Sequence, residues 1–215
     1  NQGDTLLPAH ALAKLAKGDM LIIEPGSYEE IIINQDSIIV STEGKIPDHL
    51  SIVLSGKNCI LKDFVGDHIR CGQDFAIVNS AVDTIYLEGD EKKAELTIYN
   101  SAIGNIHTYD SDREWNIFIK NCVIRYGSRY NNEFPAPLGL RPPPTGAIRY
   151  SQRCIFEIQN SVICGSPYVF LFAIYSRSIK AKLTLKDNVL FGENGLGMVS
   201  AFSNDKNNNL VILEP

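Results

Sequence analysis

A repeated motif with a polar residue at its centre constrains the fold of this chain more than any other feature. The motif reads apolar-x-apolar-x-[Asn/Asp]-small-[Ala/Val]-apolar, and its copies lie 16 to 39 residues apart. Five of six copies fit it, and the first has Phe64 in place of the small residue. Self-similarity at this spacing predicts a solenoid. The polar residues are Asp63, Asn79, Asn100, Asn121, Asn160 and Asp187.

The repeat unit indicates which solenoid to expect. The fixed leucine framework of leucine-rich repeats is missing, and so are the amphipathic helices of helical repeats. Asn and Asp tolerate the left-handed backbone that a sharp corner requires, and stacked Asn amides can hydrogen-bond from one rung to the next. The sequence therefore predicts an all-β parallel β-helix. A meander of hairpins is the alternative, but the Asn-Gly turns that would join hairpins are scarce.

A second column of residues supports the β-helix. The strand after each corner carries an apolar residue that we expect to point inward: Ile69, Ile85, Ile106, Ile148, Ile174 and Val199. Neighbouring side chains on a strand point to opposite faces, so the residue after each one should point outward. These outward residues are Arg70, Tyr86, His107, Arg149, Tyr175 and Ser200. We expect them to form one exposed column along the coil.

The N-terminal region resembles the opening of right-handed parallel β-helices in the pectate-lyase-like superfamily, nearest the branch of chondroitinase B and the alginate lyases. The resemblance is carried by a helix-like segment at 8–17, then Gly18-Asp19, Pro25-Gly26 and Tyr28. It implies one right-handed, single-stranded β-helix domain over 1–215, with the 8–17 helix as an N-terminal cap. The branch's catalytic Lys and Arg motifs do not stand out in this sequence.

The outward column and one long insertion suggest a ligand. Residues 125–147 form a Pro- and Arg-rich insertion loop that could wall a groove or serve as a contact surface. Tyrosine offers a flat face to sugar rings, and arginine binds carboxylates through two hydrogen bonds. We therefore expect binding of an acidic, uronate-containing polysaccharide; cross-strand packing of these side chains is the alternative. The expected binding residues are Arg70, Tyr86, Tyr175, Arg125 and Arg129.

If the protein is an enzyme, β-elimination from a uronide is the reaction that these residues suit best. Arg149 or Arg70 would neutralise the substrate carboxylate, and His107 or Tyr150 would act as base or acid. A calcium-assisted variant would use the acidic run 110–114, for which an acidic surface loop is the alternative interpretation. The outward column contains no pair of acids, so a hydrolase is the weaker enzyme hypothesis.

The competing hypothesis is a non-catalytic β-helix: a stalk, adhesin or tail-spike-like segment that forms a homo-oligomer. The chain ends in the strand-like segment 210–215, and an uncapped last rung would invite pairing with another chain. A further column follows the corners, and if it faces outward it would form an apolar stripe typical of an interface. The sequence leaves its direction open. The column contains Val65, Ala81, Ala102, Val123, Val162 and Val189.

The composition argues against nucleic acids and membranes as partners. The chain has 215 residues and a net charge of −5 without a basic tail, which argues against nucleic-acid binding. No apolar run approaches the roughly 20 residues of a membrane span. The five cysteines lack metal-ligand spacing, and we interpret them as small buried residues. No cofactor other than calcium is suggested. The chain begins at Asn1, as after removal of a secretion signal or any other trimming, and we expect a secreted or cell-surface protein.

Overall fold

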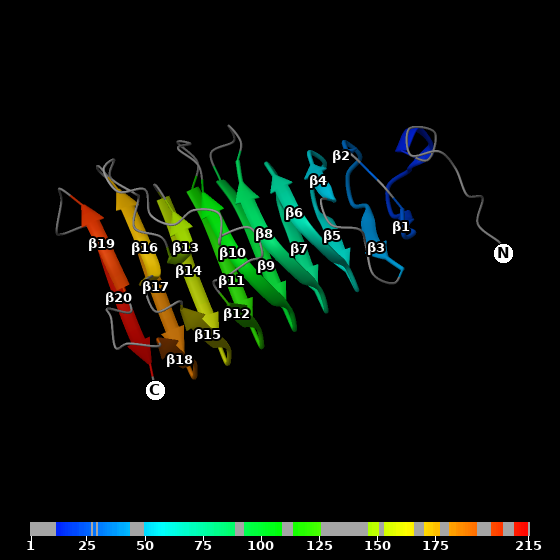
Figure 1. Ribbon diagram of the computed structural model, residues 1–215. Coiled ribbons are helices and arrows are strands. Elements are labelled where there is room, and N and C mark those ends of the chain that lie inside the picture. Colours follow the sequence, from blue (N-terminus) through cyan, green and yellow to red (C-terminus); the bar gives the residue numbers. More distant parts are fainter. Residues whose placement is uncertain are drawn as a thin grey trace, which may run out of the picture.

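The computed structural model describes residues 12–26, 28, 30–43, 50–88, 93–108, 114–125, 146–150, 153–165, 170–176, 181–192, 199–203 and 209–214. These residues form an all-β parallel β-helix, as the repeat predicted. Successive strands stack along one axis from the N-terminal to the C-terminal end (Figure 1). Every strand pair in the described part of the chain is parallel, and the strands form two sheets, called sheet A and sheet B below.

Sheet A contains the strand that precedes each corner. In the described part of the chain it has nine strands: β1 (Met20–Ile23), β3 (Ile39–Thr42), β5 (Cys59–Lys62), β7 (Phe75–Val78), β9 (Lys93–Tyr99), β11 (Glu114–Lys120), β14 (Arg153–Gln159), β17 (Ala181–Lys186) and β20 (Asn209–Glu214). Their register aligns the residues before the six predicted corners, from Lys62 through Val78, Tyr99, Lys120 and Gln159 to Lys186.

Sheet B contains the strands after each corner and divides partway along the coil. Its described strands are β2 (Glu30–Ile33), β4 (Ser51–Leu54), β6 (Val65–Cys71), β8 (Ala81–Leu87), β10 (Ala102–Thr108), β12 (Val123–Arg125), β13 (Gly146–Tyr150), β15 (Val162–Gly165), β16 (Phe170–Ser176), β18 (Val189–Gly192) and β19 (Val199–Ser203). β10 pairs with β12 through its first residues and with β13 through its later ones. The 125–147 insertion predicted from the sequence thus coincides with the connection from β12 to β13, but its first residue belongs to β12 and 146–147 belong to β13.

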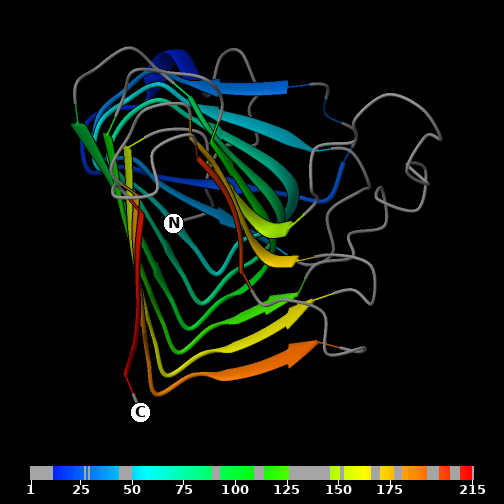
Figure 2. The same ribbon diagram turned by 90° about the vertical axis from the view of Figure 1, so that its left-hand side faces the viewer.

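Each later coil has three sides. Seen from the C-terminal end, sheet A runs down one side, β12, β15 and β18 run along the base, and β13, β16 and β19 run up the third side (Figure 2). Successive coils approach the viewer while the chain turns in this sense, so the β-helix is right-handed. In β8 the bend between base and third side falls where two consecutive residues, Thr84 and Ile85, are both buried.

The polar corners have the backbone conformation that the sequence predicted. All six have φ between 47° and 55°. The Asn79, Asn100, Asn121 and Asn160 amides also form a ladder, called the asparagine ladder below. Each Nδ2 donates to the Oδ1 of the preceding Asn, at 3.4, 3.3 and 2.8 Å.

A second ladder runs inside the corner, at the motif's small position. The backbone N–H at this position in one coil donates to the side chain at the same position in the next coil. The acceptors are Ser80 Oγ for Phe64, Ser101 Oγ for Ser80, Cys122 Sγ for Ser101, Ser161 Oγ for Cys122 and Asn188 Oδ1 for Ser161. Each buried donor is thereby satisfied, which explains why a small polar side chain recurs here. Phe64, at the start of the ladder, points into the core and is fully buried.

Stacked apolar columns fill the coil. The column Ile69, Ile85 and Ile106 is fully buried, as predicted, and Trp115 and Phe156 are the largest buried side chains near sheet A's middle strands. Burial of one such side chain contributes about 1.5–3 kcal/mol. Cys59, Cys71 and Cys122 are buried, as predicted for small core residues. The side chains of the other two cysteines lie outside the described part.

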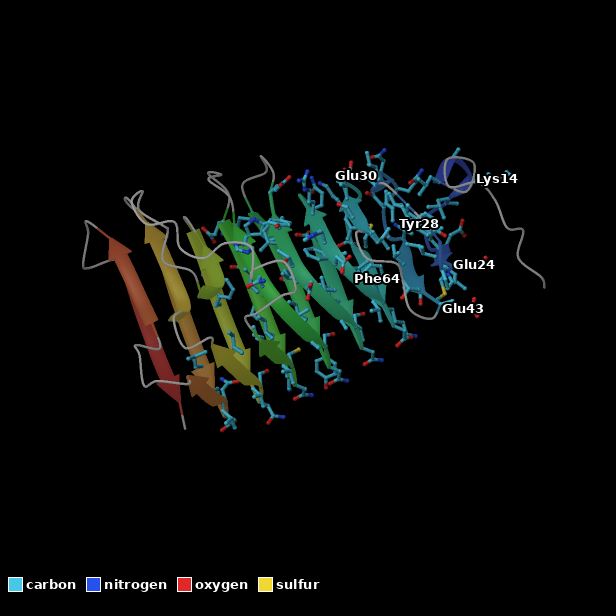
Figure 3. The ribbon with its side chains drawn as sticks, viewed as in Figure 1. Lys14, Glu24, Tyr28, Glu30, Glu43 and Phe64 are labelled. Carbon is cyan, nitrogen blue, oxygen red and sulfur yellow. The ribbon has the colours of Figure 1, made fainter. Side chains whose placement is uncertain are left out.

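The N-terminal cap is shorter than the predicted 8–17 helix. Residues 12–14 are helical, 15–17 are not, and 8–11 lie outside the described residues. Leu12 and Leu15 pack against the core, and a turn at Gly18, with φ of 92°, leads into β1. The helix ends early because Asp19 closes this turn on Ala16: the Ala16 N–H donates to Asp19 Oδ2, and the Asp19 N–H to Ala16 O. Tyr28 lies at the same end of the coil (Figure 3), and its hydroxyl donates to Glu24 O. No helix in the described residues is long and apolar enough to cross a membrane.

Candidate functional site

Four members of the predicted outward column occupy equivalent positions on neighbouring strands. The register pairs Arg70 on β6 with Tyr86 on β8, Tyr86 with His107 on β10, and His107 with Arg149 on β13. Arg70 is exposed, and the Tyr86 and His107 side chains are half-buried. The structure describes the backbone of Arg149 but not its side chain. The predicted column is therefore confirmed in backbone register from Arg70 to Arg149.

Three rings stack along this face, and we call them the ring ladder. Tyr86 and His107 stack with centroids 5.5 Å apart and planes 19° apart, and His68 lies 5.9 Å from Tyr86 at a tilt of 38°. The ring faces are turned to one another along the coil axis. A ligand on this surface would therefore meet ring edges rather than an open aromatic face. Nδ1 of His68 is buried, so that atom faces away from such a ligand.

His68 is the member of the ring ladder that sequence reasoning missed. It precedes the inward Ile69, whereas the predicted column took only the residue that follows each inward position. Side chains on both sides of an inward residue point outward, so the same rule could have found it. The rule fails one strand further on, because Thr84, which pairs with His68, is buried at the bend of the sheet.

Tyr175 does not belong to the column at the predicted position. Phe172, not Ile174, pairs with Ile148, so Ala173 lies opposite Arg149. Tyr175 lies two residues further along β16 and pairs with Phe202. The error arises because apolar residues occupy every second position from Phe170 to Ile174, so the sequence fits equally well after a shift of two residues.

The remaining predicted site residues lie apart from the ring ladder or beyond the described structure. Tyr150 is next to Arg149 on β13 and pairs with Ile174, while Arg125 ends β12 and pairs with Cys164. Both are placed by backbone only, and Arg129 lies outside the described residues. In the acidic run proposed for calcium, 110–113 lie outside them as well. Glu114 is described, and its Oε1 forms an ion pair with Lys93 Nζ at 3.3 Å.

The column after the corners faces outward, which the sequence left open. Val65, Val123 and Val189 are 46%, 46% and 51% exposed, Ala102 is exposed, and Ala81 and Val162 are half-buried. We call these six residues the apolar stripe. The residue at each corner adopts a left-handed conformation and the next one points inward, so the third points outward. A shallow groove of about 520 Å³ runs between the stripe and the asparagine ladder, from Val65 to Val123.

The structure thus defines a right-handed parallel β-helix with two distinct outer surfaces: the ring ladder on sheet B and the apolar stripe at the corner. No protein-family model, curated protein or solved structure matches the chain. The fold class therefore rests on strand register, and the resemblance to the pectate-lyase-like superfamily stays a prediction.

Proposed function

We propose that this protein is a polysaccharide-binding β-helix whose ring ladder and Arg70 hold an extended acidic sugar chain. The observation that carries the proposal is the continuous stack of His68, Tyr86 and His107 across β6, β8 and β10. Stacking fixes the rings relative to one another. The polar edges of Tyr86 and His107 and the exposed Arg70 guanidinium then form a preorganised row of hydrogen-bonding groups.

The geometry favours an extended ligand over a compact one. Neighbouring strands lie about 4.8 Å apart, so β6 to β13 span about 14 Å along the coil axis. The acidic character of the ligand is inferred from Arg70 and from the backbone position of Arg149 next to His107. Asp67 and Asp83 on neighbouring strands would limit affinity for a polyanion, so contacts should concentrate where the cations are.

Calorimetric titration with polygalacturonate, alginate and chondroitin sulfate tests the proposal, with dextran as the neutral polymer. We expect binding to at least one acidic polymer and none to dextran. Arg70→Ala should weaken binding at least about tenfold, because it removes a charge-assisted contact. Tyr86→Phe keeps the stacked ring, and its weaker binding would locate the contact at the phenol oxygen.

Lys62→Ala is the matched control, because Lys62 is an exposed cation on sheet A, away from the ring ladder. Its affinity should stay within about twofold of the wild type, since a single distant charge contributes little. Equal losses of affinity in the Lys62 and Arg70 variants would show that the binding is non-specific charge attraction. The absence of binding to every acidic polymer would refute the proposal.

β-Elimination is a second candidate function, favoured by the pairing of His107 with Arg149 on adjacent strands. An arginine would neutralise the uronate carboxylate, and His107 would remove the C5 proton. The C4–O4 bond would then break as the C4=C5 double bond forms, and the leaving oxygen would take a proton from Tyr150 or solvent. Ultraviolet absorbance of the unsaturated product tests this. The signal should appear with the wild type and vanish in His107→Ala. If no polymer that binds gives a signal, elimination is refuted and binding is the only function supported.

A further inference from the structure

The apolar stripe lies between two columns of strand positions. On the sheet A side, the column directly before the corners contains Lys62, Val78, Tyr99, Lys120 and Gln159. On the sheet B side, the positions two residues after the stripe are Asp67, Asp83, Gly104, Arg125, Cys164 and Phe191. In this second column the two acidic positions precede Gly104 and the one basic position follows it.

An acidic position before Gly104, Asp83, and a basic position after it, Arg125, complement a copy of the same column that runs in the opposite direction.

We propose that a second copy of this chain packs on the apolar stripe, antiparallel to the first, around a two-fold axis at Ala102. In this arrangement Ala102 faces its own counterpart, Ala81 faces Val123 of the other copy, and Val65 faces Val162. Asp83 then lies opposite Arg125. On the other edge, Lys62 faces Gln159 and Lys120 faces Val78, so no like charges meet.

Three features select a second copy as the occupant. Another β-helix has the same rung spacing of about 4.8 Å, so side chains of both copies can interdigitate over several coils. The stripe contains only Val and Ala, which permit close approach, and Gly104 beside the axis carries no side chain. The most exposed stripe residues, such as Val65 and Val123 at 46%, gain most from being covered.

The asparagine ladder, which borders the same groove, can add hydrogen bonds. Within the ladder, the Asn100 amide donates one N–H to Asn79 and accepts one bond from Asn121. An amide has two donors and two acceptor lone pairs, so half of its capacity is directed elsewhere. Asn amides of a second copy would use that capacity at the rim of the interface.

Sedimentation equilibrium of the full chain tests whether the stripe is the interface. We expect a dimer for wild type. Ala102→Arg should raise the dimer dissociation constant at least about a hundredfold, because the arginine meets its own counterpart at the axis. The matched control is Ile22→Arg: Ile22 is 54% exposed on β1, outside the stripe. A wild type that stays monomeric, or a loss of dimer in the Ile22 variant alone, overturns the proposal.

Cysteine cross-linking tests the antiparallel orientation. Ala81→Cys and Val123→Cys proteins are oxidised separately and as a mixture, and the joined peptides are identified by mass spectrometry. The proposal predicts a disulfide between positions 81 and 123 in the mixture, with little cross-linking of either protein to itself. A disulfide between two copies of position 81 indicates a parallel arrangement and overturns the proposal. Circular dichroism confirms that each variant is folded.

Discussion

Replacement of Asn121 by alanine should destabilise the β-helix by about 2–3 kcal/mol. Its amide donates to Asn100 at 3.3 Å and accepts from Asn160 at 2.8 Å. Because both bonds lie near the surface, we assign about 0.5 kcal/mol to each, the lower end of the range for a net hydrogen bond. The backbone of Asn121 has φ of 55°, a left-handed conformation that costs alanine about 1–2 kcal/mol.

Asn121→Gly separates the two contributions. Glycine adopts the left-handed conformation freely, so this variant loses only the ladder bonds plus about 0.5–1 kcal/mol of extra chain entropy, in total about 1.5–2 kcal/mol. Urea unfolding of both variants and wild type gives the comparison. At an ordinary strand position glycine is the more destabilising residue, so the predicted order is reversed here. An alanine variant as stable as the glycine variant would refute the argument from corner conformation.

Other substitutions test the packing inside and beside the corner. Cys122→Ala should cost about 1–3 kcal/mol, because the buried Ser101 N–H loses its acceptor, whereas Cys122→Ser should be tolerated in urea unfolding, as serine fills the equivalent position in other coils. Burial raises the pKa of the Cys122 thiol above its usual 9.0. The neutral thiol therefore contributes stability that is complete below pH 9 and is lost as the pH rises through the folded-state pKa. Serine has no such ionisation, so in alkaline buffer the unfolding temperature of Cys122→Ser should fall less with pH than that of the wild type. Gly104→Ala should destabilise the fold by about 1–3 kcal/mol and lower its unfolding temperature, because the new Cβ would lie 2.3 Å from Asp83 O. The control is Ala102→Ser at an exposed position on the same strand, which should leave the unfolding temperature unchanged.

The corners could be predicted because their requirement is local. A sharp turn with a left-handed residue favours Asn or Asp whatever packs around it, and all six predicted positions have that conformation. Two further left-handed corners, at Ser37 and Asn58, were missed. They precede sheet A strands rather than follow them, and the residues around them share no repeated motif, so nothing in the sequence aligned them with each other.

Positions that depend on loop length or on bends in the sheet could not be predicted. The alternation of Phe170, Phe172 and Ile174 permits two registers, and only the pairing with Ile148 selects one. Likewise, alternation predicts that Thr84 points outward like its strand partner His68, but the bend of the sheet buries it. Tyr86 and His107 were found because they lie beyond the bend, where regular alternation resumes.

The apolar stripe shows where a correct pattern lacked a direction. The sequence identified its six residues, yet the corner interrupts the alternation of side chains between the two faces. Whether the residue after a corner points inward or outward depends on how many residues the corner contains. The structure places one left-handed residue and one inward residue before Val65, Val123 and their equivalents, and this count turns the stripe to the surface.

Affinity for oligogalacturonates of increasing length tests the central claim most directly. The ring ladder and its flanking arginines span about 14 Å from β6 to β13, at about 4.8 Å per strand. The affinity should therefore rise with each added sugar until the oligomer covers this distance and then level off, and Arg70→Ala should remove part of the rise. Binding that is absent, or equally weak at every length, would contradict a ligand site along the ring ladder.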